Sequence, residues 1–165
     1  MTKWFLAVAL ILMAFQFGFA QSKESLVGTW KLVSMTTTKE KGEVRDPWGP
    51  NLIGVLTYTA AGRVSVVVAA SGRKPYSSPS PSDTERAEAA RMFLAYAGSY
   101  TFTGDEIIHH IEVASDPGLT NTELRRTVKL EGDRLTLRGG FLVDGRMRVP
   151  NLELVWERMK PKTTD

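Results

Sequence analysis

Cysteine is absent from the 165 residues of the chain. This absence excludes disulfide bonds, thiol nucleophiles and cysteine-ligated metals. Histidine is scarce, because only His109 and His110 are present. Adjacent residues of a strand point to opposite faces, so these two imidazoles cannot hold one metal ion between them. We therefore expect no metal site and no cofactor.

Several catalytic motifs are missing as well. The chain has no Gly-x-Ser-x-Gly elbow, no phosphate-binding loop and no His-Glu-x-x-His helix. An excess of one charge sign is also lacking, since 21 basic and 18 acidic side chains give a formal net charge of +3. The Lys and Arg residues are scattered along the chain. This pattern argues against nucleic acid and anionic membrane surfaces as partners.

The N-terminus holds the one long apolar run. Lys3 precedes a charge-free stretch at 4–15, and small residues follow at Gly18 and Ala20. This layout predicts a signal peptide over residues 1–20, cleaved near Ala20, and hence a periplasmic or secreted protein. The run is shorter than the roughly 20 residues of a membrane-spanning helix, so no stable membrane anchor is expected after cleavage. An uncleaved N-terminal anchor is the alternative.

Residues 21–165 are predicted to form a single domain whose core covers about 26–159. Runs rich in β-branched residues, separated by turn signals such as Gly-Asp, indicate strands. Eight strands are predicted, at 26–38, 52–59, 63–70, 99–103, 106–115, 123–131, 134–138 and 152–159. The fold class is therefore all-β, an eight-stranded antiparallel up-and-down barrel or a sandwich.

One helix is predicted between the third and fourth strands. Ser82 and Glu85 have the spacing of a capping box, and Gly98 stands where a C-terminal cap is expected. Phe93 and Tyr96 fall on the apolar side of this helix. Such a helix could cover one end of a barrel.

Side-chain alternation predicts which polar groups point into the barrel. In two of the strands, Arg126 and His109 each belong to a set that is otherwise apolar, whereas His110 faces outward. Tyr58 and Tyr100 also fall on interior faces. A dry core has little reason to hold an arginine, a histidine and two tyrosines together.

The inward arginine is the most informative of these groups. A buried charge is costly unless it is paired, and the interior sets contain no acidic residue. Arg126 is therefore expected to meet a carboxylate outside these sets, water in a cavity or an anionic ligand. An ion pair at the barrel end or a stack on an aromatic ring is the simpler alternative. His109 could equally be a hydrogen-bonded core histidine, and Tyr58 and Tyr100 packing residues.

The two ends of the predicted domain carry a family resemblance. Gly28-Thr29-Trp30 resembles the Gly-x-Trp signature of lipocalins, and Trp156-Glu157-Arg158 resembles the region whose closing arginine packs on that tryptophan. With the ordered motifs between them, the chain resembles the bacterial and fungal lipocalin-like domain proteins of the calycin type over 26–158. The resemblance implies an eight-stranded barrel with an internal pocket, in which Gly28, Trp30, Trp156 and Arg158 are structural. It implies no reaction.

Three functions remain open from the sequence. The leading hypothesis is a binding protein for a small hydrophobic or amphipathic ligand, with Arg126 holding an anionic group and His109, Tyr58 and Tyr100 adding hydrogen bonds. The second is an enzyme of the isomerase, cyclase or hydrolase type that uses His109 and Arg126. The third is an interaction protein that uses the loop at 47–50 and the helix. The expected state is a monomer or a homodimer.

Overall fold

The structure is a computed structural model, and it describes residues 22–38, 42–143 and 146–161. Its strands are β1 (Gly28–Thr38), β2 (Val44–Arg45), β3 (Leu52–Tyr58), β4 (Arg63–Ala70), β5 (Phe93–Phe102), β6 (Glu106–Ala114), β7 (Glu123–Glu131), β8 (Arg134–Val143) and β9 (Arg146–Arg158). Its helices are α1 (Lys23–Leu26), α2 (Asp83–Arg91) and the 3₁₀ turn η1 (Pro117–Leu119). The predicted signal peptide lies outside the described residues.

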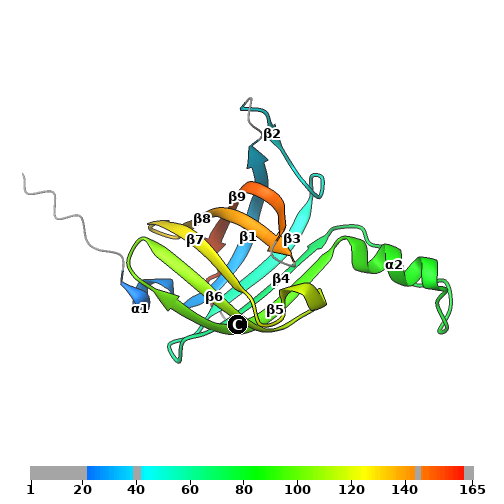
Figure 1. The fold of residues 1–165 in the computed structure, drawn as a ribbon, viewed down its shortest axis with the longest axis horizontal. Coiled ribbons are helices and arrows are strands. Elements are labelled where there is room, and N and C mark those ends of the chain that lie inside the picture. Colours follow the sequence, from blue (N-terminus) through cyan, green and yellow to red (C-terminus); the bar gives the residue numbers. More distant parts are fainter. Residues whose placement is uncertain (1–21, 39–41, 144–145, 162–165) are drawn as a thin grey trace, which may run out of the picture.

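The strands form one antiparallel sheet that closes on itself (Figure 1). From β3 to β9 each strand pairs with the next along the chain, and β1 closes the barrel by pairing with both β3 and β9. Each of the eight long strands thus has a hydrogen-bonded neighbour on both sides, although β1 pairs with β3 only over Gly28–Lys31. The two-residue β2 is an extra strand that extends one end of β1. The predicted eight-stranded up-and-down barrel is therefore confirmed.

The predicted helix lies in the expected connection but is shorter than expected. The capping box of Ser82 and Glu85 forms, and α2 then ends at Arg91. The chain continues as β5, which contains Phe93 and Tyr96 and bonds to β4 on one side and β6 on the other. The backbone N–H and C=O groups on both sides of β5 are thus hydrogen-bonded to neighbouring strands. Without β5, the barrel would be open between β4 and β6.

Gly98 does not cap the helix, because it lies within β5. The register between β5 and β6 shifts between Ala97 and Gly98. A Cβ atom at Gly98 would lie 1.9 Å from the carbonyl oxygen of His110, so only glycine allows the strands to approach this closely. The glycine marks a β-bulge rather than a helix end.

The end of the barrel that carries α1, which we call the plugged end, is filled by packed side chains. Leu26 and Trp30 are fully buried, and the Trp30 Nε1 group donates to the carbonyl oxygen of Leu26 at 3.0 Å. The Arg158 guanidinium lies 4.0 Å from the centre of the Trp30 ring. It also donates to the carbonyl oxygens of Val27 at 2.9 Å and Ser25 at 2.6 Å. These contacts fasten α1 across the start of β1 and the end of β9.

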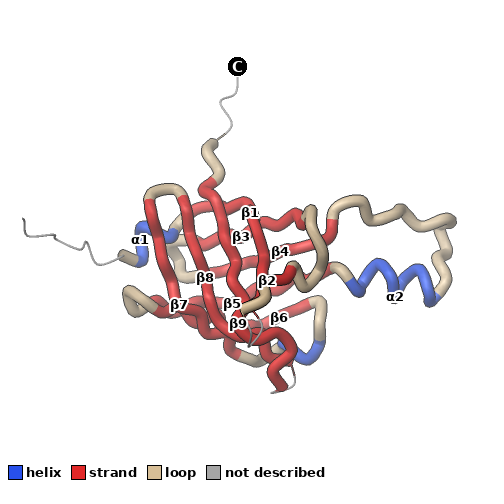
Figure 2. Tube along the Cα trace, turned by 90° about the horizontal axis from the view of Figure 1, so that it is seen from above, coloured by secondary structure: helices blue, strands red, loops and turns tan. Residues whose placement is uncertain are grey.

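The helix α2 lies away from the barrel wall in both views (Figures 1 and 2). None of its residues is buried. A backbone hydrogen bond of 3.0 Å from Ala70 to the carbonyl oxygen of Met92 joins the two ends of the connection that contains it. Among the described residues, no helix is long and apolar enough to cross a membrane.

Candidate functional site

A cavity of about 260 Å³ opens inside the barrel, beyond the plugged end. Its wall is mainly apolar, with Leu56 from β3, Val68 from β4 and Leu154 from β9 among its residues. Trp48, from the loop between β2 and β3, also lines it, and this side chain is half-buried. Four polar side chains interrupt this wall: those of Tyr96, His109, Asp116 and Arg126. The indole of Trp156 is a further part of the wall.

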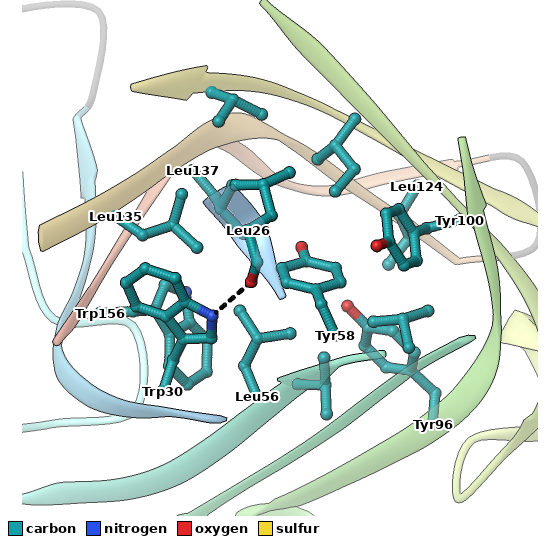
Figure 3. Packing of buried hydrophobic residues seen from close by; sticks show 14 of the residues in the cluster. Leu26, Trp30, Leu56, Tyr58, Tyr96, Tyr100, Leu124, Leu135, Leu137 and Trp156 are labelled. Carbon is teal, nitrogen blue, oxygen red and sulfur yellow. Dashed lines mark hydrogen bonds between the residues drawn. The ribbon is translucent and has the colours of Figure 1, made fainter. Parts of the chain in front are cut away.

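His109 forms the centre of a buried polar cluster. Its side chain is 1% exposed, as the alternation of β6 predicts. Its Nε2 atom lies 2.7 Å from the hydroxyl of Tyr58, and its Nδ1 atom lies 2.9 Å from the hydroxyl of Tyr96. The strand β3 and the consecutive strands β5 and β6 thus meet at one imidazole. Figure 3 shows Tyr58 and Tyr96 projecting from their strands into the packed interior.

Burial keeps this imidazole neutral. Desolvation, with further contributions from Arg126 and His110, lowers the pKa of His109 to about 3. A neutral imidazole donates from one ring nitrogen and accepts at the other. One of the two tyrosines therefore donates to His109, and the other accepts from it. The tyrosine that accepts keeps its own hydroxyl proton for another acceptor.

Both tyrosines stay protonated at neutral pH. Burial raises the pKa of Tyr96 to about 12, and burial also raises the pKa of Tyr58 well above its ordinary value. Tyr96 and His109 both line the cavity, whereas Tyr58 does not. Tyr58 contributes through His109.

Arg126 lies on β7, and only 4% of it is exposed. Its Nη1 group donates to the carbonyl oxygens of Arg125 at 2.9 Å and Gly140 at 2.6 Å. No carboxylate of a described residue forms an ion pair with it. Burial lowers the pKa of Arg126, but a guanidinium stays charged in proteins. The cavity wall thus holds a positive charge without an ion-pair partner in the described chain.

Geometry explains why Arg126 lies against β8. A Cβ atom at Gly139 would come within 3.2 Å of the Arg126 Nη1 atom and 2.5 Å of the Arg125 carbonyl oxygen. The missing side chain lets the guanidinium reach the Gly140 carbonyl. Two bonds use the Nη1 hydrogens, so three of the five N–H donors of Arg126 have no acceptor among the described residues.

The acidic residue of the wall, Asp116, is bound to its own loop. Its Oδ1 atom accepts from the backbone N–H of Gly118 at 2.9 Å, at the start of η1. Asp116 is half-buried and follows the end of β6. It is therefore a group of the cavity rim rather than a counter-ion fixed to Arg126.

The structure brings together three of the four predicted ligand-binding residues and separates one. Tyr58, His109 and Arg126 belong to the cavity region, and Tyr58 reaches it through His109. The Tyr100 hydroxyl donates to the Thr59 carbonyl oxygen at 3.1 Å, away from the cavity wall. The Tyr100 ring packs on Tyr58 with 4.8 Å between their centres. Tyr100 thus supports the cluster from behind.

Sequence reasoning missed Tyr96. Assigning it to the helix hid the period of two that links Leu94, Tyr96, Gly98 and Tyr100. In β5, Tyr96 and Tyr100 are both buried, four residues apart on one face. That alternation was the signal that could have found Tyr96.

The four residues predicted to be structural fall in two places. Gly28, Trp30 and Arg158 meet at the plugged end, where a Cβ at Gly28 would lie 2.9 Å from the Arg158 Nη1 atom. Trp156 lies elsewhere, on the cavity wall. It is 1% exposed and is paired across the sheet with Leu32 and Leu135.

A closed antiparallel barrel with a plugged end and an internal cavity is the class of protein that this geometry defines. The family model of the lipocalin-like domain matches residues 27–159. The match covers most of the chain, so the protein belongs to the lipocalin-like domain family. A search of the curated proteins found no match.

Proposed function

We propose that the protein is an exported carrier that binds a small hydrophobic or amphipathic molecule with an anionic group inside the barrel. The observation that carries this proposal is Arg126, a buried cation on the cavity wall with three N–H donors left over. A buried charge is strongly stabilised when an opposite charge joins it in a water-poor site. An anionic ligand would supply the partner that the described chain lacks.

The size and lining of the cavity support a small ligand with an apolar body. About 260 Å³ is close to the lower limit of roughly 300 Å³ for typical ligand pockets. The wall combines mainly aliphatic side chains with a few polar anchors, which is the usual composition of such pockets. The Arg126 guanidinium carries donors only, so it favours an oxygen acceptor on the ligand. In the tautomer in which His109 Nδ1 donates to Tyr96, the Tyr96 hydroxyl proton is free for the same acceptor.

Export is the second part of the proposal. It rests on the charged, apolar and small-residue pattern of residues 1–20. Outside the cytoplasm, a barrel without cysteine is held together by burial and closure alone. A lipid-like acid or another small hydrophobic molecule of the cell envelope is then a more suitable ligand than a nucleotide.

Acid–base catalysis by His109 receives less support from the geometry. Both ring nitrogens already bond to tyrosine hydroxyls, and the pKa of His109 is lowered to about 3. A general base works best when its pKa lies near the operating pH. His109 is better suited to orient Tyr96 than to accept a proton from a substrate.

Native mass spectrometry of the protein purified from its own host tests the proposal. We expect a retained anionic small molecule on the wild type and on His110→Gln, a matched outward-facing control. Arg126→Met should lose this adduct. Binding of 1-anilinonaphthalene-8-sulfonate, an anionic amphipathic dye, should weaken at least tenfold in Arg126→Met. Wild-type protein that retains no adduct and binds no dye would contradict the proposal.

The interaction hypothesis makes a different prediction. A protein that acts through the loop at 47–50 should tolerate Arg126→Met and lose its partner when Trp48 is replaced. A carrier should lose its ligand in the first variant. The same two variants therefore separate the two hypotheses in one set of measurements.

A further inference from the structure

The hydrogen bonds around the buried imidazole of His109 can run in either of two directions. Its Nε2 atom lies 2.7 Å from the Tyr58 hydroxyl, and its Nδ1 atom lies 2.9 Å from the Tyr96 hydroxyl. A neutral imidazole has one N–H group and one acceptor nitrogen. Each direction therefore leaves one of the two tyrosines with a hydroxyl proton that His109 does not accept. The surroundings of the two tyrosines decide which of them this is.

Tyr58 needs His109 as the acceptor of its proton. Tyr58 is 1% exposed and does not line the cavity. Among the described residues, His109 Nε2 is the one hydrogen-bond partner of its hydroxyl. If Nε2 carried the imidazole proton, the Tyr58 proton would be buried without an acceptor, which is costly and rare in folded proteins. Tyr58 therefore donates to Nε2, and the imidazole proton is on Nδ1.

Tyr96 has the opposite surroundings. The Nδ1–H group of His109 donates to the Tyr96 oxygen, so the proton of the Tyr96 hydroxyl is left for another acceptor. Tyr96 is 9% exposed, and its side chain lines the cavity. The proton that His109 does not accept thus belongs to the tyrosine of the pair that borders open volume, where a ligand atom can accept it.

Arg126 lines the same cavity and acts on Tyr96. Burial raises the pKa of Tyr96 to about 12, and the positive charge of Arg126 opposes this rise. Three N–H donors of Arg126 have no acceptor among the described residues. The two residues therefore offer only donors and a single positive charge. A carboxylate complements them, because it accepts hydrogen bonds at both oxygens and carries one negative charge. A phosphate monoester would bring nearly two negative charges.

We propose that a hydrogen-bond relay runs from Tyr58 through His109 to Tyr96, and that Tyr96 donates its hydroxyl proton to a carboxylate of the ligand beside Arg126. This inference rests on the proposed function and names the anionic group of the ligand. Tyr96 and Arg126 contact the ligand. Tyr58 and His109 are positioning residues, because they make the Tyr96 oxygen an acceptor of the Nδ1–H bond and so leave its proton for the cavity.

The tautomer of His109 tests the relay in the wild-type protein. Two-bond proton–nitrogen NMR spectra of nitrogen-15-labelled protein at neutral pH distinguish a protonated Nδ1 from a protonated Nε2. The spectrum of His110→Gln assigns the signals, because the chain has only two histidines. We expect the proton on Nδ1 in at least about 80% of the molecules. A smaller share would overturn the relay.

Binding of octanoate, measured by displacement of 1-anilinonaphthalene-8-sulfonate, tests the ligand end of the relay. Tyr96→Phe keeps the ring and removes the donated proton, so the affinity for octanoate should fall about tenfold. Tyr76→Phe makes the same change at an exposed residue outside the cavity wall and should leave the affinity within about twofold of the wild type. Equal affinities of the two variants would overturn the contact with Tyr96.

Tyr58→Phe separates a positioning role of Tyr58 from a packing role. The phenyl ring fills the same space, but Nε2 of His109 loses its donor. Neither tautomer then has a partner at Nε2, so the two tautomers should become comparably populated. The affinity for octanoate should fall by less than in Tyr96→Phe. Tautomer populations that this variant leaves unchanged would assign Tyr58 to packing alone and overturn the relay.

The relay and the proposed function fail in different measurements. If the wild-type protein binds neither octanoate nor the dye, the proposed function itself fails. If both bind and Arg126→Met weakens them, while His109 carries its proton on Nε2, the carrier proposal stands and only the relay is lost.

Discussion

Two arginines of this barrel, the partly exposed Arg158 and the buried Arg126, differ in their partners. Arg158 at the plugged end contacts the Trp30 ring, two backbone carbonyls and the Asp133 carboxylate at 3.2 Å. Arg126 in the cavity contacts two backbone carbonyls and no carboxylate of the described chain. The first arginine completes its contacts within the fold. The second keeps N–H donors that have no acceptor among the described residues. This difference distinguishes an arginine that holds the fold together, here called a clamp, from one that can bind a ligand.

The largest expected effect comes from Arg158→Ala. The change removes a cation–π contact and two charge-assisted hydrogen bonds, and it leaves the carbonyls of Ser25 and Val27 without their donor. We expect the free energy of unfolding to fall by about 3 kcal/mol, measured by urea denaturation. The cavity should still bind 1-anilinonaphthalene-8-sulfonate when the variant is folded. A loss below about 1 kcal/mol would show that the plugged end does not depend on this clamp.

The pH dependence of the free energy of unfolding tests whether His109, on the cavity side of the comparison, is buried and neutral. Unfolded His109 takes up a proton near pH 6.5, whereas the folded residue stays neutral down to about pH 3. Between these values the unfolded state binds more protons, so the free energy of unfolding falls as the pH falls, by up to about 1.4 kcal/mol per pH unit. Denaturation midpoints from pH 6.5 to 4.5 measure this slope.

The matched variants His109→Gln and His110→Gln make that measurement specific. His109→Gln should flatten the slope over this window, although it also weakens the bonds to Tyr58 and Tyr96. His110→Gln alters an outward side chain that bonds to Thr101 and Glu123, and it should keep the slope. Identical slopes in the two variants would contradict a neutral, buried His109.

Arg126→Met is expected to have a small effect on stability in the absence of ligand. The change leaves two carbonyls without a donor but also removes a buried charge, and these contributions oppose each other. We expect the free energy of unfolding to change by less than about 1 kcal/mol. Thermal denaturation of ligand-free protein checks this. A loss similar to that of Arg158→Ala would make Arg126 a clamp of the same kind.

The smallest effect is expected at the outer surface of the plugged end. The Lys23 ammonium lies 5.0 Å from the centre of the Tyr100 ring, and Lys23 itself is exposed. Lys23→Ala should therefore destabilise the fold by only about 0.5 kcal/mol. Lys31→Ala, a change at an exposed residue of β1, is the matched control. Urea denaturation of the two variants measures whether Lys23→Ala lowers the free energy of unfolding more than Lys31→Ala does, by more than the scatter between repeats.

The sequence predicts much of this fold because the alternation of inward and outward side chains along a strand is a local property. His109 and Arg126 share strand faces with aliphatic residues, and both are buried in the structure. The turns at Gly104 and Gly132 adopt positive φ angles, as tight turns often require. These features depend on neighbours within one or two strands.

Other features depend on the closed sheet and could not be predicted locally. The segment from Arg91 to Gly98 suits a helix by its alanines and apolar spacing, but β4 and β6 both need a strand between them. The missing hydrogen-bond partner of the buried Trp156 Nε1 atom depends on how side chains from several strands pack, and the sequence pattern of one strand does not predict it. The role of Tyr100 behind Tyr58 likewise emerges only when the barrel closes.

The connection that carries α2 has a consequence for local stability. It leaves the barrel after β4 and returns at Met92, where the Ala70 bond to the Met92 carbonyl closes its base. Because α2 buries no residue, its amide hydrogens should exchange through local opening long before the barrel unfolds. Proteases should cut this connection first, and its length could vary among relatives without any change in the cavity.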